Sequence, residues 1–148
     1  MLDVLMKFGA YRIDYLESSA ASASDAVAFY LRANCPRHEF YSREAKHQLY
    51  QGLALIAANY GLHKLVGVYV DVNELSNINR PAYQRLKMDM LDGLFHKVFV
   101  VDPGALLGHP VADADMRDLY WSAGGFEIIS MQEGYFEPLE LCCGPLAA

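Results

Sequence analysis

The sequence predicts a three-layer α/β domain, in which a mostly parallel sheet is covered by helices on both faces. Two observations carry this prediction: short apolar runs alternate with longer segments of helical periodicity, and 148 residues suit one compact domain. Because a strand, a helix and a second strand in succession are typical of a βαβ unit, we expect parallel strands joined by right-handed crossovers. The hydrophobic content of 53% and charged content of 20% are those of an ordinary globular chain.

The first predicted unit covers the strand, helix and strand nearest the N-terminus. Residues 26–32 (AVAFYLR) are a short apolar and aromatic run that stops before Pro36, which indicates a buried strand. From Ser42 to Tyr60 the apolar residues recur on one helical face, and Gly61 follows as a C-terminal stop. Residues 65–70 (LVGVYV) then predict the second strand.

The second half of the chain repeats this alternation. Pro81 opens the next predicted helix, where its missing N–H group costs nothing. Four apolar side chains are predicted to form the inward face of this helix: Leu86, Met90, Leu91 and Leu94. The remaining elements are predicted in order as a strand over 98–101, a loop over 102–110, a helix over 113–123 and a strand over 126–129.

The two ends of the chain fit the alternation less well. Residues 1–25 are interpreted as an N-terminal extension and linker, in which the small residues 18–24 (SSAASAS) form the linker. The beginning of this extension adds either an edge strand or a short helix. Residues 26–133 form the predicted domain, and 134–148 a C-terminal tail in which prolines and a glycine exclude any long helix.

Composition narrows the cellular setting and the classes of function. Three cysteines (Cys35, Cys142 and Cys143) suit a reduced cytoplasm better than a disulfide framework. No apolar run approaches the roughly 20 residues that cross a bilayer, and the N-terminus does not resemble a signal peptide, so we expect a cytoplasmic protein without a membrane partner. The net charge of −6 weighs against a free-standing nucleic-acid binder, because phosphate contacts require an excess of Lys and Arg.

No metal or cofactor is expected from the sequence. The five histidines include no pair spaced four residues apart and have no Cys-x-x-Cys partner, which disfavours a zinc site. Neither of the glycine-rich phosphate-binding motifs, G-x-G-x-x-G and G-x-x-x-x-G-K-[ST], is present. The ten tyrosines fall mostly at predicted core positions, so we interpret them as packing residues before base-stacking platforms.

Four segments share their order and spacing with a known family. They are AVAFYLRAN at 26–34, LVGVYVD at 65–71, NRPAYQRLKMDMLDGLFHKVFVVD at 79–102 and GGFEIIS at 124–130. Across about residues 25–133 they resemble the catalytic domain of the serine recombinases, the resolvases and invertases. The most specific segment is Asn79-Arg80-Pro81 at the start of a helix, after the strand that ends in Asp71. The resemblance implies a flavodoxin-like, resolvase-type sheet with helices on both faces.

The resemblance also implies a chemical reaction. This chain lacks the nucleophile that the reaction requires. In the family, a serine hydroxyl attacks a DNA phosphodiester and forms a phosphoserine link, while several arginines surround the phosphate. The family's first strand ends in Tyr-x-Arg-x-Ser, and the matching residues here are Tyr30, Arg32 and Asn34. A carboxamide cannot form the phosphoester, so we expect no catalytic residue and no site-specific recombination by this domain.

Further departures from the family concern the arginines and the assembly helix. The family's Asp-Arg-Leu-x-Arg pattern corresponds to residues 104–108, where Ala105 and Gly108 occupy the two arginine positions. A Ser-Gly pair of the family corresponds to Leu75 and Ser76. The family continues from its last strand into a long dimer-forming helix, whereas this chain ends after about twenty residues in an acidic, proline-interrupted segment, so we expect that helix to be absent.

Ligand sites of parallel sheets lie at the carboxyl ends of the strands, and five residues are expected to gather there as a remnant cleft: Tyr30, Arg32, Asn34, Asp71 and Arg80. Arg32, Asp71 and Arg80 are either a surviving anion site or a buried ion-pair cluster kept for structure. Cys35, one position beyond Asn34, is either a substitute nucleophile or, as we favour, a small packed loop residue.

Three functions remain open from the sequence. The first is a catalytically inactive recombinase-like domain that acts as an interaction or regulatory module related to DNA recombination and a mobile element, with a protein partner or a second copy of itself. The second is a non-cutting DNA-binding accessory protein, whose phosphate contacts come from the basic middle of the chain: Arg32, Arg37, Arg43, Arg80, Arg85 and Lys87. The third is a small-molecule enzyme that uses the old cleft.

Overall fold

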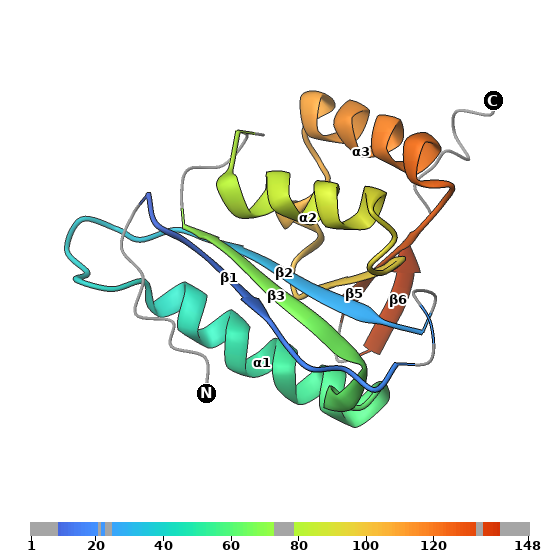
Figure 1. Ribbon diagram of the computed structural model, residues 1–148. Helices are drawn as coiled ribbons and strands as arrows, with labels where there is room; N and C mark the ends of the chain where they lie inside the picture. The colour runs from blue at the N-terminus through green and yellow to red at the C-terminus, as the bar shows by residue number, and fades with distance from the viewer. Residues whose placement is uncertain (1–8, 21, 23–24, 73–78, 133–134, 140–148) are drawn as a thin grey trace.

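The computed structural model describes residues 9–20, 22, 25–72, 79–132 and 135–139 (Figure 1). Six strands form one sheet in the order β1-β3-β2-β4-β5-β6. The strands are β1 (Tyr11–Tyr15), β2 (Val27–Ala33), β3 (Leu65–Val72), β4 (Lys97–Val100), β5 (Glu127–Gln132) and β6 (Tyr135–Leu139). The α-helices are α1 (Arg43–Asn59), α2 (Pro81–Leu91) and α3 (Pro110–Ala123), and short 3-10 turns cover Leu62–Lys64 and Pro103–Ala105.

The four central strands are parallel, and antiparallel strands close both edges of the sheet. β2 lies between β3 and β4, and β5 pairs with β4, all in parallel register. Taken in chain order, these four strands have the spatial order 2-1-3-4 of a flavodoxin-like sheet. β1 pairs antiparallel with β3, and β6 pairs antiparallel with β5. The predicted mostly parallel α/β sheet is therefore confirmed.

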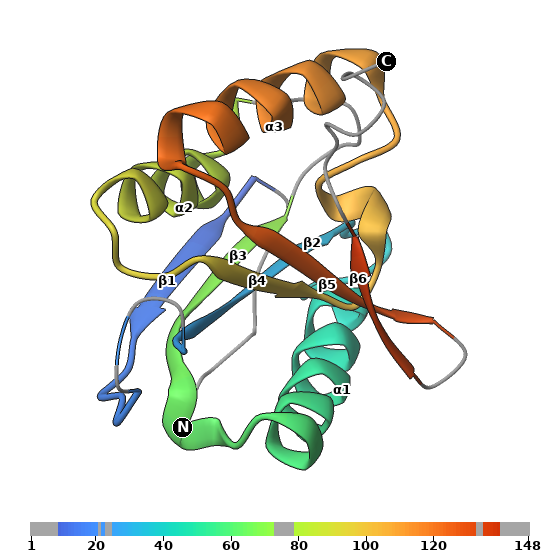
Figure 2. The ribbon, with the colours of Figure 1, turned by 90° about the vertical axis from the view of Figure 1, so that its right-hand side faces the viewer.

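Helices cover both faces of the sheet, as Figures 1 and 2 show: α1 lies on one face, and α2 and α3 lie side by side on the other. Alternate side chains of β2 enter the two cores, because successive residues of a strand point to opposite faces. Phe29 and Leu31 belong to the core beneath α1, whereas Ala28 and Tyr30 belong to the core beneath α2 and α3. The sheet is thus buried on both sides, which accounts for its continuous apolar strands.

Local sequence explains where the helices begin and how closely one of them packs. The Ser42 hydroxyl accepts a hydrogen bond from the Ala45 amide and caps α1. Within α1, a Cβ atom on Gly52 would lie 2.1 Å from the buried ring of Phe29, so only glycine lets the helix approach the sheet this closely. Pro81 and Pro110 occupy the first turns of α2 and α3, where their lack of an N–H group is harmless.

The structure corrects the predicted inward face of α2. Leu86 and Met90 are buried as predicted, but Leu91 is 51% exposed and Leu94 is 43% exposed. Ala82 and Tyr83, in the first turn of α2, are buried in their place. Leu94 is not part of the helix, which ends at Leu91. The start of α3 also lies three residues before its predicted position, because Pro110 rather than Asp113 opens the helix.

The ends of the chain extend the sheet. The open choice between an edge strand and a short helix in the N-terminal extension resolves as the edge strand β1. The sequence analysis did not predict β6, in which Pro138 pairs with Ile129. Proline is tolerated there because β6 is an edge strand, where a missing backbone donor breaks no central ladder.

Candidate functional site

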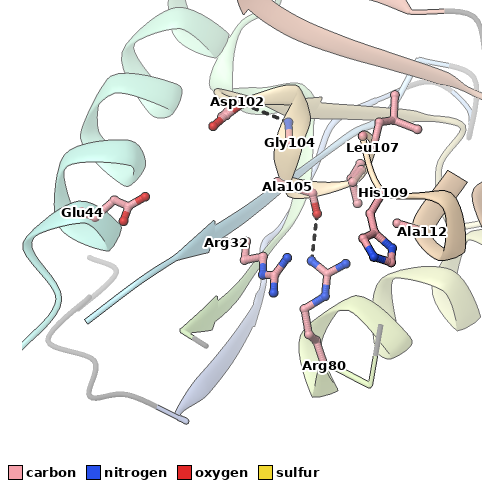
Figure 3. Close-up of a pocket in the computed structure, with 11 residues that line it drawn as sticks. Arg32, Glu44, Arg80, Asp102, Gly104, Ala105, Leu107, His109 and Ala112 are labelled. Carbon is pink, nitrogen blue, oxygen red and sulfur yellow. Dashed lines mark hydrogen bonds between the residues drawn. The ribbon is translucent and has the colours of Figure 1, made fainter. Parts of the chain in front are cut away.

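A cavity of about 410 Å³ lies where the order of the central strands reverses. The chain leaves β2 for β3 on one side and later reaches β4 on the other, and ligands of such sheets bind beside this point. The cavity wall combines the end of β2, the start of α2, the loop after β4 and the start of α3 (Figure 3). Its polar side chains are Arg32, Glu44, Arg80, Asp102 and His109.

Beneath the cavity, three of the predicted site residues form one buried hydrogen-bond chain. Arg80 Nη1 donates to Tyr30 Oη over 2.9 Å, and Tyr30 Oη donates to Asp71 Oδ2 over 2.9 Å. All three side chains are at most 1% exposed. Burial, followed by the neighbouring Asp71 carboxylate, raises the pKa of the Tyr30 phenol well above its ordinary value, so the phenol remains a donor at neutral pH.

Asp71 also holds the start of α2. Its Oδ1 accepts the Ala82 amide over 3.0 Å, and its Oδ2 accepts the Tyr83 amide over 2.9 Å. These two amides belong to the first turn of the helix, where backbone donors lack intrahelical acceptors and a negative charge is favourable. Burial raises the pKa of Asp71 even though these hydrogen bonds and Arg80 act in the opposite direction. Asp71 therefore joins β3 to α2 and does not line the cavity.

The Arg80 guanidinium group passes from this chain into the cavity wall. It lies 4.4 Å from the centre of the Tyr83 ring, and its Nη1 donates to the Ala105 carbonyl oxygen over 2.8 Å (Figure 3). Its Nε is buried and has no hydrogen-bond partner among the described residues. A buried guanidinium group rarely keeps an N–H donor without a hydrogen-bond partner. A bound ligand with an acceptor oxygen could supply that partner.

Arg32 supplies a second guanidinium group to the same cavity, from the end of β2. Figure 3 shows this guanidinium group beside that of Arg80, and Arg32 is only 7% exposed. Burial, followed by the positive charge of Arg80, lowers the pKa of Arg32. Two neighbouring buried cations repel each other, so the cavity is suited to an anion, which would reduce both the repulsion and the desolvation cost.

Asn34 does not line this cavity. It is exposed just beyond β2, and its Oδ1 accepts the amide of the next residue, Cys35, over 2.9 Å. Its backbone amide donates to Glu44, and its carbonyl oxygen accepts the Ser42 hydroxyl, so it connects β2 to the start of α1. Cys35 is buried, and its Sγ lies near the carbonyl oxygen of Glu39 at 3.7 Å, outside the cavity lining.

The two positions expected to have lost arginines do line the cavity. Ala105 ends the 3-10 turn after β4, and Gly108 follows in the same loop. Gly108 has a φ of 105°, a conformation that a residue with a Cβ atom rarely adopts. An arginine at this position would therefore require a different loop conformation, although a Cβ atom there would meet open space.

His109 is a cavity residue that the sequence does not predict; the histidines are considered there only as zinc ligands, which their spacing disfavours. His109 lines the cavity and caps α3, with Nδ1 accepting the Val111 amide over 3.2 Å. The available signal was the pair His109-Pro110, because the residue before a proline at the first helical position is the N-cap.

Two basic residues nominated for DNA contacts are engaged elsewhere. Arg85 forms an ion pair with Asp89 at 3.2 Å, and Lys87 forms one with Asp115 at 2.7 Å. The first pair lies within α2, the second joins α2 to α3, and neither lines the cavity. The nominated positions Leu75 and Ser76 lie outside the described residues, as do Cys142 and Cys143.

Neither a metal centre nor a membrane span is found in the described part of the chain. Its His, Cys, Asp and Glu side chains form no group of three or more that could hold a metal ion. None of its helices has both the length and the apolar character required to cross a bilayer.

Comparison with known proteins supports the fold. The crystal structure of the N-terminal catalytic domain of TP901-1 integrase is similar to this chain, with a TM-score of 0.58 and 23% sequence identity over 75% of this chain and 81% of that domain. At this identity the likeness establishes the fold alone, and it confirms the predicted recombinase-type architecture. No protein-family model and no curated protein matches the sequence.

The buried tyrosines predict a loss of stability at alkaline pH. Burial raises the pKa of Tyr30, Tyr69 and Tyr83 above the ordinary value of 10.0. Above pH 10 the unfolded chain releases phenol protons that the folded chain retains, so the free energy of unfolding falls by about 1.4 kcal/mol per pH unit for each such tyrosine. Urea unfolding between pH 8 and 11, followed by circular dichroism, measures this slope.

Phenolate absorbance at 295 nm gives the matching readout. We expect the buried tyrosines to ionise only as the protein unfolds. Tyr83→Phe should therefore reduce the absorbance change that accompanies unfolding by the contribution of one tyrosine. Ionisation of all ten tyrosines in a fully folded protein would contradict the structure.

Proposed function

We propose that this chain is a catalytically inactive recombinase-like domain that serves DNA recombination as an interaction or regulatory module. The single observation that carries the proposal is the environment of Asn34. Where the recombinase resemblance places a serine nucleophile, this chain has a carboxamide, and its oxygen already accepts the Cys35 amide. A carboxamide in this arrangement has no oxygen that can form a phosphoester.

Among the described residues, no group near Asn34 supports a replacement nucleophile. Cys35 is buried, and its Sγ faces backbone carbonyl oxygens at the start of the β2–α1 loop instead of the cavity. The Ser42 hydroxyl donates to the Asn34 carbonyl oxygen over 2.7 Å and accepts the Ala45 amide, and is therefore committed to capping α1. Both residues support the fold in this region.

The cavity also lacks charge for phosphoryl transfer. A phosphoryl transition state is stabilised by several fixed cationic donors, and bidentate arginines suit this purpose. Here Ala105 and Gly108 form the wall at the two expected arginine positions, and the Nη1 nitrogen of Arg80 donates both to Tyr30 and to the Ala105 carbonyl oxygen. In the described lining, the guanidinium groups that face an anion are therefore those of Arg32 and Arg80 alone.

A second function is favoured by these same two guanidinium groups. They lie side by side at the strand-order reversal, and such an arrangement favours recognition of a phosphate without cleavage of the chain that carries it. We therefore propose non-cutting recognition of DNA phosphate as the alternative role of the cavity. This role would use fewer cations than the sequence suggests, because Arg85 forms an ion pair within α2 and Lys87 forms one with Asp115 of α3.

The inactive role predicts that no covalent protein–DNA adduct forms. Supercoiled DNA carrying candidate recombination sites would be incubated with the protein, stopped with detergent and separated by electrophoresis, with an active serine recombinase in parallel. Asn34→Ser should also form no adduct, because it restores a hydroxyl without the arginines at 105 and 108. An adduct of the unaltered protein through any residue would contradict the proposal.

The alternative role predicts weak, salt-dependent binding of duplex DNA. Two phosphate contacts imply that the association constant falls about tenfold between 50 and 200 mM salt. Arg32→Met should roughly halve the slope of log K against log salt, whereas Arg117→Met, an exposed cation on α3, should leave it unchanged. Fluorescence anisotropy with a labelled duplex measures both slopes, and no binding at 50 mM salt would exclude this role.

A further inference from the structure

The loop between β2 and α1 presents an aromatic pair to solvent. Phe40 is 71% exposed and Tyr41 is 36% exposed, and their ring centres lie 4.6 Å apart with the planes inclined at 42°. Most other aromatic rings of the fold, by contrast, serve the cores. Exposed neighbouring rings offer a flat apolar surface on which another planar group can stack.

Three exposed cations flank this pair along the chain: Arg37 precedes it, and Arg43 and Lys46, which line the same hollow, follow it. Within the described ranges no carboxylate forms an ion pair with any of them, whereas Lys64, Arg85 and Lys87 each have an acidic partner. The local charge therefore differs in sign from the net charge of −6 of the whole chain. The excess of cations in this loop attracts anions.

The two acidic residues of the region serve the backbone. Glu39 Oε1 accepts the Arg43 amide over 3.1 Å, and Glu44 Oε2 accepts the Asn34 amide over 3.0 Å. Each carboxylate thus satisfies a backbone donor at the start of α1 or the end of β2. Their other oxygens face His38 Nε2 at 3.9 Å (Glu39) and the Gln48 side-chain amide at 3.3 Å (Glu44), and among the described residues neither forms an ion pair with the three cations. The three cations remain available to a ligand.

The loop is held in shape without a ligand. The Glu39 amide donates to the Pro36 carbonyl oxygen over 2.9 Å, and the Ser42 hydroxyl closes the loop onto Asn34 over 2.7 Å. Residues 38–43, together with Lys46, line a hollow of about 390 Å³. A preformed surface loses little conformational entropy when a ligand binds, which favours affinity.

We propose that this aromatic–basic loop, formed by Arg37, Phe40, Tyr41, Arg43 and Lys46, binds single-stranded nucleic acid. A base would stack on the aromatic pair while the cations contact the flanking phosphates, the combination by which single strands are held without sequence preference. A duplex is a poorer fit, because its bases are already stacked on one another. The loop shares no lining residue with the Arg32–Arg80 cavity, so the proposal goes beyond the function proposed for that cavity.

The test compares a labelled 20-nucleotide oligothymidylate with the duplex that it forms with oligoadenylate, by fluorescence anisotropy at 50 mM salt. The single strand should bind more tightly than the duplex, and its affinity should fall as salt rises. Phe40→Leu, which retains apolar bulk but removes the ring, should weaken binding about tenfold, whereas Phe40→Trp should preserve it. Trp121→Leu is the matched control, because Trp121 is 69% exposed on α3.

Each of these outcomes would overturn the proposal: no binding of the single strand at 50 mM salt, tighter binding of the duplex, or equal affinity of Phe40→Leu and the unaltered protein. Capture of polyglutamate with equal affinity would instead identify the loop as an acidic-protein site and would likewise overturn it. Circular dichroism melting of each variant verifies its fold. A covalent adduct through Asn34 or its neighbours would refute the inactive role and leave the Phe40 result intact, so the two failures are distinguishable.

Discussion

The hydrogen-bond chain from Arg80 through Tyr30 to Asp71 is the constraint on which the cavity depends. It connects the start of α2 to β2 and β3, and the second bond of Arg80 Nη1 reaches the loop after β4. Every member is buried, so each polar group must find its partner inside the protein. Loss of any one member would leave an uncompensated charge or donor at the strand-order reversal, which is far more costly than loss of a surface pair.

This hydrogen-bond chain also distinguishes the residues that support the fold from those that line the cavity. Sequence analysis left Arg32, Asp71 and Arg80 open as either an anion site or a structural ion-pair cluster. In the structure, Asp71 receives the first amides of α2 and the Tyr30 hydroxyl, all beneath the cavity. Arg32 lines the cavity, and Arg80 does both, with one end in the buried chain and a second guanidinium nitrogen unpartnered. The structural interpretation thus applies to Asp71 and to the bonded end of Arg80, and the anion-site interpretation to Arg32 and the rest of the Arg80 guanidinium group.

The central elements of the fold could be predicted because local sequence determines them. β2 and β3 are continuous apolar runs, and Pro81 marks the start of α2. The edge strands were harder: β1 is only partly buried, and Pro138 in β6 argues against a strand until its edge position is known. An edge position is a property of the whole sheet, which no local pattern contains.

The candidate site was predictable in its membership but not in its geometry. Tyr30, Arg32, Asp71 and Arg80 were nominated together, and the structure brings them together, but Asn34 lies outside the cavity lining and His109 lies within it. Which side of a loop faces a cavity depends on backbone conformation, such as the positive φ of Gly108, and on contacts between residues far apart in the chain.

The most direct test of the account is a double-mutant cycle between Tyr30→Phe and Arg80→Met, measured by urea unfolding at pH 7. Each change alone removes the bond between the two side chains, so the second change should cost much less in the presence of the first. The account predicts a coupling free energy of about 1–3 kcal/mol. Effects that add to within about 0.5 kcal/mol would show that the two residues act independently, and would contradict the buried chain as the support of the cavity.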